Sequence, residues 1–225
     1  MGVRPATAPR RTAQVTEETR GLILAAAEAE FAECGFATAR LSDIAERVGI
    51  TRAAVIYHFR DKKALYDAVL EAAFQPLSER VQAALAAPGS SAERIERVLQ
   101  AWFNYATERP TLGRLFIREV ASAQDALRAE VEQLAAPMYA AFVSTIEQGK
   151  RDGEFRAINP LHVANILSGA TIWLISGAHL MGGNDTESRA ERLGQHRDEL
   201  VGIAHFLLGI RTHVEKHEGA AADRG

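Results

Sequence analysis

The segment 51–65 reads TRAAVIYHFRDKKAL and combines hydrogen-bond donors with positive charge. Phenol and imidazole groups donate hydrogen bonds, and arginine and lysine side chains attract anions. Phosphate oxygens along a duplex are bound by this combination of groups. The segment is therefore predicted to lie along a DNA backbone, and the side chains that suggest this contact are Tyr57, His58, Arg60, Lys62 and Lys63.

The distribution of charge supports the same interpretation. The chain has 225 residues and a formal net charge of −3, so its total charge gives no hint of a nucleic-acid partner. Residues 40–63, however, hold six Arg or Lys against three Asp or Glu, and the rest of the chain is acidic overall. A basic region on an acidic body is typical of an electropositive footprint for DNA.

The cysteine content, the N-terminus and one uncharged segment indicate where the protein is located. The single cysteine, Cys34, excludes an internal disulfide and a zinc site built from cysteines, and we interpret it as a small buried residue beside Gly35. It fits a reducing cytoplasm, and the N-terminus shows no signal-peptide pattern, so a cytoplasmic location is expected. Residues 157–184 contain no Asp, Glu, Lys or Arg, as a membrane span would. Polar residues are interspersed among them, however, and this favours a helix buried between protein surfaces.

Apolar residues recur at helical spacing along the chain, and no alternating segment is long enough for a sheet. We expect an all-α fold of about nine helices, with a three-helix helix-turn-helix domain over 16–60 and a larger helical domain over 61–217. Residues 1–15 and 218–225 are expected to be disordered. The larger domain should begin with a helix after Asp61 and continue with helices at 92–108, 111–122, 125–152, 160–181 and 186–217, with Pro137 kinking or splitting the helix that contains it.

Capping residues define the helix-turn-helix. Gly35 is expected to stop the first helix as a left-handed cap, Gly49 to end the second, Thr51 to cap the third and Asp61 to cap the fourth. Two short helices joined at Gly49 have the dimensions of the motif whose second helix enters the major groove.

The third helix divides into two faces. Val55 and Phe59 should face the core formed with Ile44 and Val48, which leaves a set of residues facing outward. In that set an arginine near the helix start can reach a guanine edge or a phosphate, and an alanine can contact a thymine methyl. The outward set is Arg52, Ala53, Ile56 and Tyr57.

Residues 20–66 resemble the DNA-binding domain of the TetR family of bacterial transcription regulators. The matching landmarks are ILAAAEAEFAECGF, DIAERVGIT and YHFRDKKAL. Two positions depart from the usual pattern: Ile56 stands where many relatives have tyrosine, and Ala39-Arg40 replaces the usual hydroxyl cap, which puts a cation near the backbone. With Arg40 included, the resemblance implies DNA contacts at Arg40, Ser42, Thr51, Arg52, Ala53, Ile56, Tyr57, His58 and Lys62.

The last two long helices, 160–181 and 186–217, carry apolar residues on more than one face, with glycines that allow close approach. This pattern predicts helices packed on both sides. The TetR resemblance implies that these helices from two chains form a four-helix bundle, so that a homodimer binds a palindromic operator. The alternative is that they only complete the core of one chain.

The middle helices carry apolar and aromatic residues that would line the effector cavity of a TetR-like protein. Taken singly, each is ordinary core. Taken together, a mostly apolar lining favours a hydrophobic or aromatic effector, and the resemblance implies a repressor that this effector releases from DNA. The pocket set is Trp102, Phe103, Tyr105, Phe116, Glu119, Met138, Phe142, Ile146 and Trp173.

Two other classes of function stay open at this stage. An enzyme would need a catalytic motif, and the sequence has no Gly-rich phosphate loop, nucleophile elbow or H-E-x-x-H, although Glu119 with His179 could form an acid–base pair. His213 and His217 have metal-ligand spacing, but a solvated tail explains them better. A helical interaction protein that has lost DNA binding is the other class. We expect a regulator with no catalytic residues, metal or cofactor.

Overall fold

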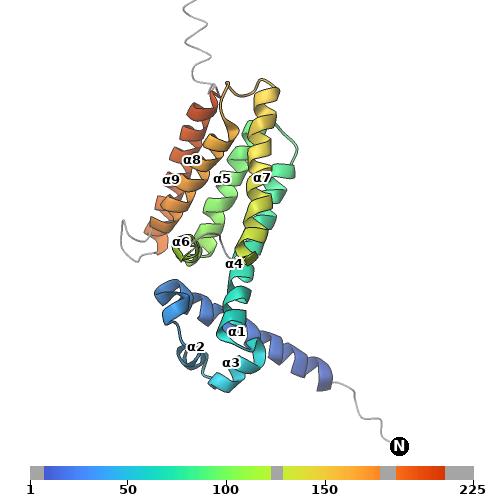
Figure 1. Cartoon of the computed structure of the whole chain (residues 1–225), viewed down its shortest axis with the longest axis vertical. Coiled ribbons are helices and arrows are strands. Elements are labelled where there is room, and N and C mark those ends of the chain that lie inside the picture. Colours follow the sequence, from blue (N-terminus) through green and yellow to red (C-terminus); the bar gives the residue numbers. More distant parts are fainter. Residues whose placement is uncertain (1–7, 123–128, 178–185, 211–225) are drawn as a thin grey trace, which may run out of the picture. The chain divides into compact units, whose positions relative to one another are not determined.

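The computed structural model describes residues 8–122, 129–177 and 186–210, and these residues form helices and short connections with no strand. The all-α prediction is confirmed, and the described residues contain nine helices (Figure 1). They are α1 (Ala8–Thr38), α2 (Leu41–Val48), α3 (Arg52–Phe59), α4 (Lys62–Ala86), α5 (Ser91–Glu108), α6 (Leu112–Ser122), α7 (Ala129–Arg151), α8 (Pro160–Gly177) and α9 (Thr186–Leu208).

The chain divides into two compact units, Met1–Ala73 and Phe74–Gly225. The division lies inside α4, whereas the sequence placed it at residue 60. The first turns of α4 belong to the first unit because their apolar side chains are buried in its core. These side chains are Leu65, Tyr66, Val69 and Leu70.

In the first unit, α2 packs against α1 and α3 packs against α2 (Figure 1). Ile44, Val55 and Phe59 are buried, as predicted for the inner faces of the two short helices. Phe31 of α1 meets the Tyr66 ring edge-on, with 4.7 Å between ring centroids. Aromatic packing between α1 and the start of α4 therefore stabilises the core of the first unit, which also contains α2 and α3.

The predicted caps are found with one difference. Gly49 ends α2 in the left-handed region, and the Ala54 N–H donates to the Thr51 hydroxyl at the start of α3. The Ala64 N–H donates to Asp61 Oδ1 over 2.8 Å at the start of α4. Gly35 interrupts α1 with φ 79° and ψ 167°, which is not the expected left-handed cap, and the helix then resumes to Thr38.

The first helix starts earlier than the sequence suggested. It begins at Ala8, whereas the sequence predicted disorder over 1–15 and a first domain from residue 16; residues 1–7 lie outside the described residues. Pro9 stands at a position where proline is compatible with a helix start, and no Gly or Pro interrupts the residues from there to Thr16. The hydroxyl of Thr19 donates to the Val15 carbonyl within the helix instead of marking its start.

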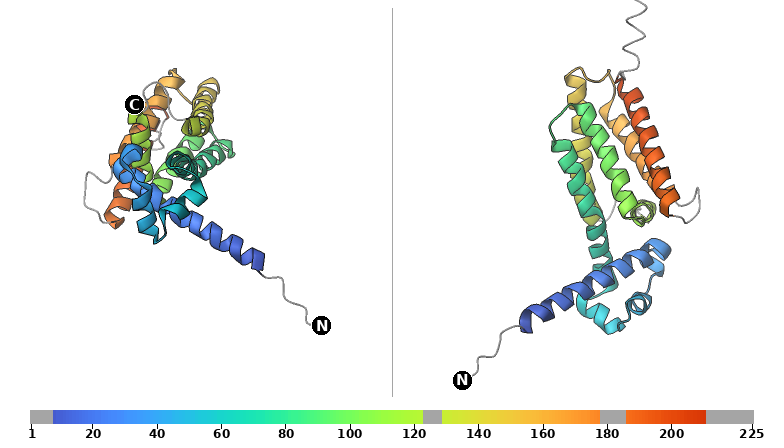
Figure 2. Two further views of the ribbon diagram at one scale, coloured as in Figure 1. Left: turned by 60° about the horizontal axis from the view of Figure 1, so that its bottom comes forward. Right: turned by 180° about the vertical axis from the view of Figure 1, so that it is seen from behind.

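In the second unit, α5, α7, α8 and α9 run side by side, and the shorter α6 lies at one end of them (Figure 2). Pro137 lies inside α7, which continues as one helix to Arg151, so of the two predicted effects, a kink or a split, the split does not occur. No helix in the described ranges is long and apolar enough to cross a membrane.

The C-terminal helix is shorter than predicted. It ends at Leu208, where Gly209 has φ 75° and the Ile210 N–H bonds the His205 carbonyl, rather than continuing to 217. This is the hydrogen-bond pattern of a glycine-terminated helix. Arg156 adds a bond from Nε to the Leu207 carbonyl over 2.8 Å. Residues 125–128, 178–181 and 211–225, to which the sequence analysis also assigned structure or disorder, are outside the described residues.

Candidate nucleic-acid interface and effector cavity

The outward face of α3 is exposed as the sequence predicted. The side chain of Tyr57 is 82% exposed, and those of Arg52 and Ile56 are also exposed, as is Ala53. Neighbouring apolar and aromatic side chains left in water commonly mark a contact surface. His58 is half-buried, and its ring lies edge-on to Tyr57 with centroids 5.4 Å apart.

A surface groove of about 470 Å³ lies beside this face. Of the nine predicted contacts, the groove brings together Arg40, Ser42, Arg52, Ile56 and Lys62. The other four, Thr51, Ala53, Tyr57 and His58, belong to the start and faces of α3 outside the groove lining. The lining adds Arg60, which belongs to the cationic segment 51–65 but not to the nine contacts that the resemblance implies. Four cationic side chains therefore line one groove against a single carboxylate, that of Asp61.

Lys62 is held by the protein itself. Its ammonium donates to the carbonyls of Phe36, Ala37 and Ala39 at 2.7, 3.2 and 3.0 Å, and it lies 4.7 Å from the centroid of the Phe36 ring. A lysine ammonium has three N–H donors, so these bonds occupy all of them. In this conformation Lys62 ties the end of α1 to the start of α4, and it presents no N–H to a phosphate.

Arg60 is the only non-glycine residue among the described residues with positive φ, at 63°. Its backbone links Phe59 at the end of α3 to the Asp61 cap of α4. Its side chain is 86% exposed and bonds Asp61 Oδ2 over 3.2 Å. The sequence had already indicated Arg60 as one of the cations of the segment 51–65, and its exposure agrees with that reading.

Asp61 is electrostatically tuned by this arrangement. The hydrogen bond from the Ala64 N–H is the largest cause that lowers the pKa of its carboxyl, and the bond from Arg60 lowers it further. The carboxylate therefore stays ionised at neutral pH and stabilises the N-terminus of α4.

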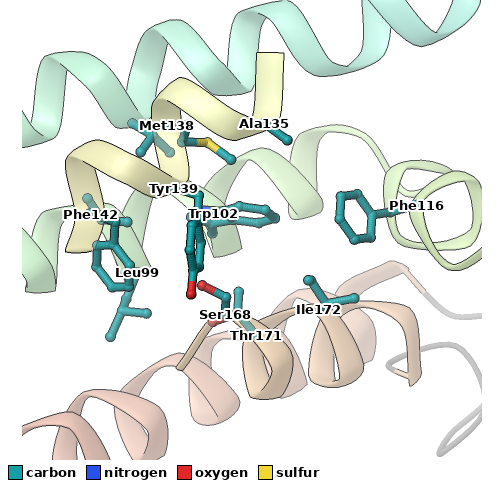
Figure 3. A pocket seen from close by; sticks show the side chains of 12 residues that line it. Leu99, Trp102, Phe116, Ala135, Met138, Tyr139, Phe142, Ser168, Thr171 and Ile172 are labelled. Atoms are coloured by element: carbon teal, nitrogen blue, oxygen red, sulfur yellow. The ribbon is translucent and has the colours of Figure 1, made fainter. Parts of the chain in front are cut away.

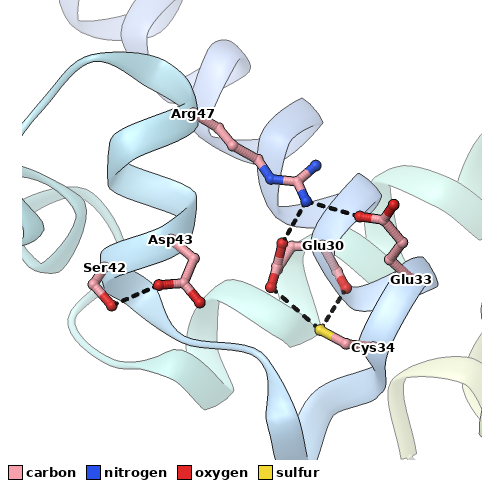
Figure 4. A network of polar contacts seen from close by, with 6 residues as sticks. All are labelled: Glu30, Glu33, Cys34, Ser42, Asp43 and Arg47. Carbon is pink, nitrogen blue, oxygen red and sulfur yellow. Dashed lines mark hydrogen bonds and ion pairs between the residues drawn. The ribbon is translucent and has the colours of Figure 1, made fainter.

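A polar network fixes α2 on α1 (Figure 4). Arg47 of α2 donates to Glu30 over 2.8 Å and to Glu33 over 2.7 Å, both on α1. The hydrogen bond with Glu33 is the largest cause that raises the pKa of the Arg47 guanidinium. The thiol of Cys34, which is half-buried, lies 3.2 Å from the Glu30 carboxylate and completes the network. This network orients α2, the first helix of the helix-turn-helix.

The second unit encloses an apolar cavity of about 110 Å³ (Figure 3). Four of the nine predicted pocket residues line it: Trp102, Phe116, Met138 and Phe142. The remaining lining is Val81, Val98, Leu99, Ala135, Tyr139, Ser168, Thr171 and Ile172. The Tyr139 hydroxyl donates to Asn165, and the Ser168 hydroxyl faces the same space (Figure 3). One end of an otherwise apolar cavity therefore carries polar groups.

The other five predicted pocket residues lie elsewhere. Phe103, Tyr105, Ile146 and Glu119 are buried in the packing of the unit without lining the cavity, and Trp173 is 62% exposed. Tyr105 instead accepts a bond from Arg109 and stacks beneath Arg80. The contribution of α8 was therefore predicted through the wrong residue: Ser168, Thr171 and Ile172 line the cavity, on one helix face at spacings of three and four residues.

Within the described residues, no group of three or more His, Cys, Asp or Glu is placed to hold a metal ion. Three histidines that the sequence analysis considered, His179, His213 and His217, lie outside the described residues.

Comparisons with known proteins identify the family. The sequence model for bacterial regulatory proteins of the tetR family matches residues 23–69, and a model for a tetracyclin repressor-like C-terminal domain matches residues 88–194. The chain belongs to the TetR family of transcriptional regulators. The first match covers the helix-turn-helix and the start of α4, and the second covers α5 to the first turns of α9.

Curated relatives match part of their length. The regulator TtgR of Pseudomonas putida is 45% identical over 62 residues, which are 28% of this chain and 30% of TtgR. The transcriptional activator FasR of Mycolicibacterium smegmatis is 32% identical over 103 residues, which are 45% of this chain and 47% of FasR. The chain therefore matches less than half the length of these relatives.

Solved structures share the fold over most of the chain. The ketosteroid transcriptional regulator KstR2 of Mycobacterium tuberculosis superimposes with a TM-score of 0.69 at 21% identity, over 81% of this chain and 93% of KstR2. AibR, solved in complex with isovaleryl coenzyme A and operator DNA, gives 0.68 at 17% identity, over 86% of this chain and 100% of AibR. At these identities the likeness concerns the fold.

Proposed function

We propose that this TetR-family chain binds duplex DNA through the exposed face of α3 and the adjacent groove. The observation that carries the proposal is the groove itself, in which Arg40, Arg52 and Arg60 lie beside the exposed Ile56 and Tyr57. Arginine forks suit both phosphates and guanine edges, and α3 is short enough to enter a major groove.

The test is binding of the full-length protein to duplex DNA from its own upstream region, measured by fluorescence anisotropy at several salt concentrations. We expect affinity to fall steeply as salt rises, because each neutralised phosphate releases a counterion. A matched duplex of scrambled sequence is the control. Equal, salt-insensitive binding to both duplexes would remove the proposal and leave a helical interaction protein.

We propose that α8 and α9 pair two copies into a homodimer. Five of the large apolar side chains exposed in the described residues lie on these two helices: Leu161, Ile166, Trp173, Ile203 and Phe206. Ile166 and Trp173 are seven residues apart on α8, and Ile203 and Phe206 are three residues apart on α9, so on each helix these side chains lie on one exposed stripe. Exposed stripes on adjacent helices are the surfaces from which four-helix bundles form.

Two glycines support this interface. Gly169 of α8 and Gly202 of α9 lie on the exposed stripes, and an added Cβ at either position would have no neighbour within 4 Å in the protomer. Glycine inside a helix costs about 1 kcal/mol relative to alanine. Packing within one protomer does not explain glycine at these positions, whereas close approach of a partner helix does. A dimer also matches a palindromic operator.

We propose that the apolar cavity binds a small hydrophobic or aromatic effector. Its volume of about 110 Å³ is smaller than the roughly 300–1,000 Å³ of ordinary ligand pockets. An effector of ordinary size must therefore displace lining side chains. Trp102 and Phe116 lie edge-on to one another and also line two smaller neighbouring voids, so their movement would merge these spaces.

We propose that effector binding releases the protein from its operator, so that the chain represses transcription. Because α4 is one helix shared by both units and Val81 lines the cavity, enlargement of the cavity acts on the helix that begins at Lys62. A ligand favours the conformation in which it fits, and that conformation then has lower DNA affinity. A reporter behind the bound promoter should rise on deletion of the gene. A fall in reporter signal would assign activation instead.

The cavity can be tested with the variant Ala135→Leu, which fills the space with a larger side chain. We expect Ala135→Leu to bind DNA like the wild type and to lose release by apolar compounds identified in a screen with the wild type. Ala136→Leu, at the neighbouring exposed position of α7, is the matched control. Retained release in Ala135→Leu would place the effector elsewhere.

A further inference from the structure

The second unit holds a cluster of three arginines that do not line its apolar cavity. Arg189, in the first turn of α9, donates from both terminal nitrogens to the carbonyl of Ala106, each over 3.1 Å. Arg114 of α6 and Arg192, one turn further along α9, are close enough to act electrostatically on Arg189. None of the three lines the cavity or the groove.

Two of these arginines have no carboxylate partner among the residues that the structure describes. In the described part of the chain, neither Arg114 nor Arg189 forms an ion pair with a carboxylate, and the Nε of Arg114 is buried without a hydrogen-bond partner. Other arginines of this protein, such as Arg47 and Arg80, bond carboxylates directly. A buried donor without a partner typically costs about 1–3 kcal/mol.

The surroundings make the missing counter-charge more costly. Arg189 is half-buried, and burial is the largest cause that lowers the pKa of its guanidinium; the charges of Arg114 and Arg192 lower it further. The Ala106 carbonyl, in the last turn of α5, offsets part of this cost because it carries partial negative charge. One carbonyl does not balance the full charges of Arg114 and Arg189.

We propose that Arg114, Arg189 and Arg192 form a binding site for an oxyanion, either a carboxylate or a phosphate group. Planar guanidinium forks match the oxygens of both groups. The N-terminal end of α9, a helix of 23 residues, adds its partial positive charge to the same place. The oxyanion is either a free ion or the head of a larger ligand, and the site does not depend on the cavity holding an effector.

Calorimetric titration and thermal unfolding of the full-length protein test the site. The probes are inorganic phosphate, hexyl phosphate, hexanoate and uncharged hexanol, each at matched ionic strength. We expect the oxyanions to bind and to raise the unfolding temperature by several degrees, and hexanol to do neither through this site. Equal binding of inorganic and hexyl phosphate indicates a free ion, whereas tighter binding of the hexyl compounds indicates an anionic head group.

The decisive variant is Arg114→Gln, because the Arg114 side chain forms no ion pair within the described residues that the substitution would break. We expect Arg114→Gln to raise the dissociation constant of the oxyanion at least tenfold and to raise the unfolding temperature of the ligand-free protein, since it removes like-charge repulsion. A structural arginine would give the opposite change in stability. Arg151→Gln, an exposed arginine of α7, controls for the change in net charge.

DNA binding separates this proposal from the proposed function. Arg114→Gln should bind operator DNA like the wild type, which also shows that it is folded. If Arg114→Gln does not fold, Arg114→Lys keeps the charge and loses the fork, and it should bind the oxyanion at least threefold more weakly. The site is refuted if the wild type binds none of the oxyanions at about 10 mM, a concentration that would detect even a weak complex. It is equally refuted if the variants bind them as the wild type does.

Discussion

Both units of this protein expose apolar side chains, but the neighbours of those side chains differ. In the first unit, Ile56 and Tyr57 lie beside the arginines of a groove. In the second, Ile166 and Trp173 lie on α8, a helix without Asp, Glu, Lys or Arg. Exposure alone therefore does not identify the partner. Cations around an exposed aromatic favour a polyanion, whereas an uncharged stripe favours another apolar protein surface.

The cationic side chains of the two units also differ in their hydrogen bonding. Lys62, which the sequence marks as a phosphate ligand, is saturated by three carbonyls. Arg114, which no sequence pattern indicated, has a buried Nε without a hydrogen-bond partner in the described ranges. A cation already bonded within the fold has a positioning role, and one left without a counter-ion is the better candidate for binding.

The strongest test of the comparison is a charge placed on the uncharged stripe. We expect Trp173→Glu to abolish the homodimer, because a buried charge without a partner disrupts the interface. Operator affinity should fall at least ~100-fold, because a single helix-turn-helix binds DNA weakly. Analytical ultracentrifugation and anisotropy measure the two effects. Val120→Glu, on an exposed apolar position of α6, is the control. A dimeric Trp173→Glu would show that the stripe is not the interface.

The second test asks whether Lys62 binds the fold or the phosphates. We expect Lys62→Ala to lower the free energy of unfolding by about 1–3 kcal/mol, because it leaves backbone carbonyls unpaired. The slope of log affinity against log salt should stay unchanged. Lys63→Ala, which loses an exposed pair with Asp67, should cost less than about 1 kcal/mol. If the slope of log affinity against log salt fell by about one in Lys62→Ala, Lys62 would instead be a phosphate ligand.

The third test concerns the exposed phenol. Tyr57→Ala should weaken operator binding about tenfold, which corresponds to about 1.4 kcal/mol, across specific and scrambled duplexes alike. Its side chain is exposed, so the unfolding temperature should not change. Arg52→Ala should differ by altering the preference between duplexes. Unchanged affinity in Tyr57→Ala would move the interface away from α3.

The fourth test separates the backbone of Arg60 from its charge. Its positive φ favours glycine, so Arg60→Gly should raise the free energy of unfolding by up to about 1 kcal/mol and still weaken DNA binding. Arg60→Ala should weaken DNA binding equally without the gain in stability. Denaturant unfolding and anisotropy distinguish these outcomes. Full DNA affinity in both variants would remove Arg60 from the interface.

The smallest effect is on pH dependence. The pKa of Asp61 is lowered chiefly by the Ala64 N–H, and that of Glu108 chiefly by its hydrogen bond with Arg80. Depressed folded-state pKa values contribute stability that is present above the unfolded values, near about pH 4, and lost as pH falls below them. Asp61→Asn and Glu108→Gln should each flatten the fall of the unfolding temperature below that pH. A profile identical to that of the wild type in both variants would assign the acid sensitivity to other carboxyls.

Much of the fold follows from local sequence. Helix existence, the Gly49 and Thr51 caps and the two faces of α3 are all visible in side-chain spacing, because they depend on neighbours within a few residues. The misplaced ends, at Ala8 and Leu208, lie where the cap signals were ambiguous. In the pocket, four of nine predicted residues line the cavity, because burial follows from composition but adjacency to a void does not.

By itself the sequence determined an all-α chain with a basic helix-turn-helix domain and the family landmarks. Periodicity, capping and charge depend on residues that are close together in the sequence. Only the tertiary structure decided which cations are already bonded and which lack partners. Lys62 meets the end of α1 across 23 to 26 residues of chain, and Arg189 meets Ala106 across 83. Such contacts are set by the packing of whole helices, and no local pattern encodes them.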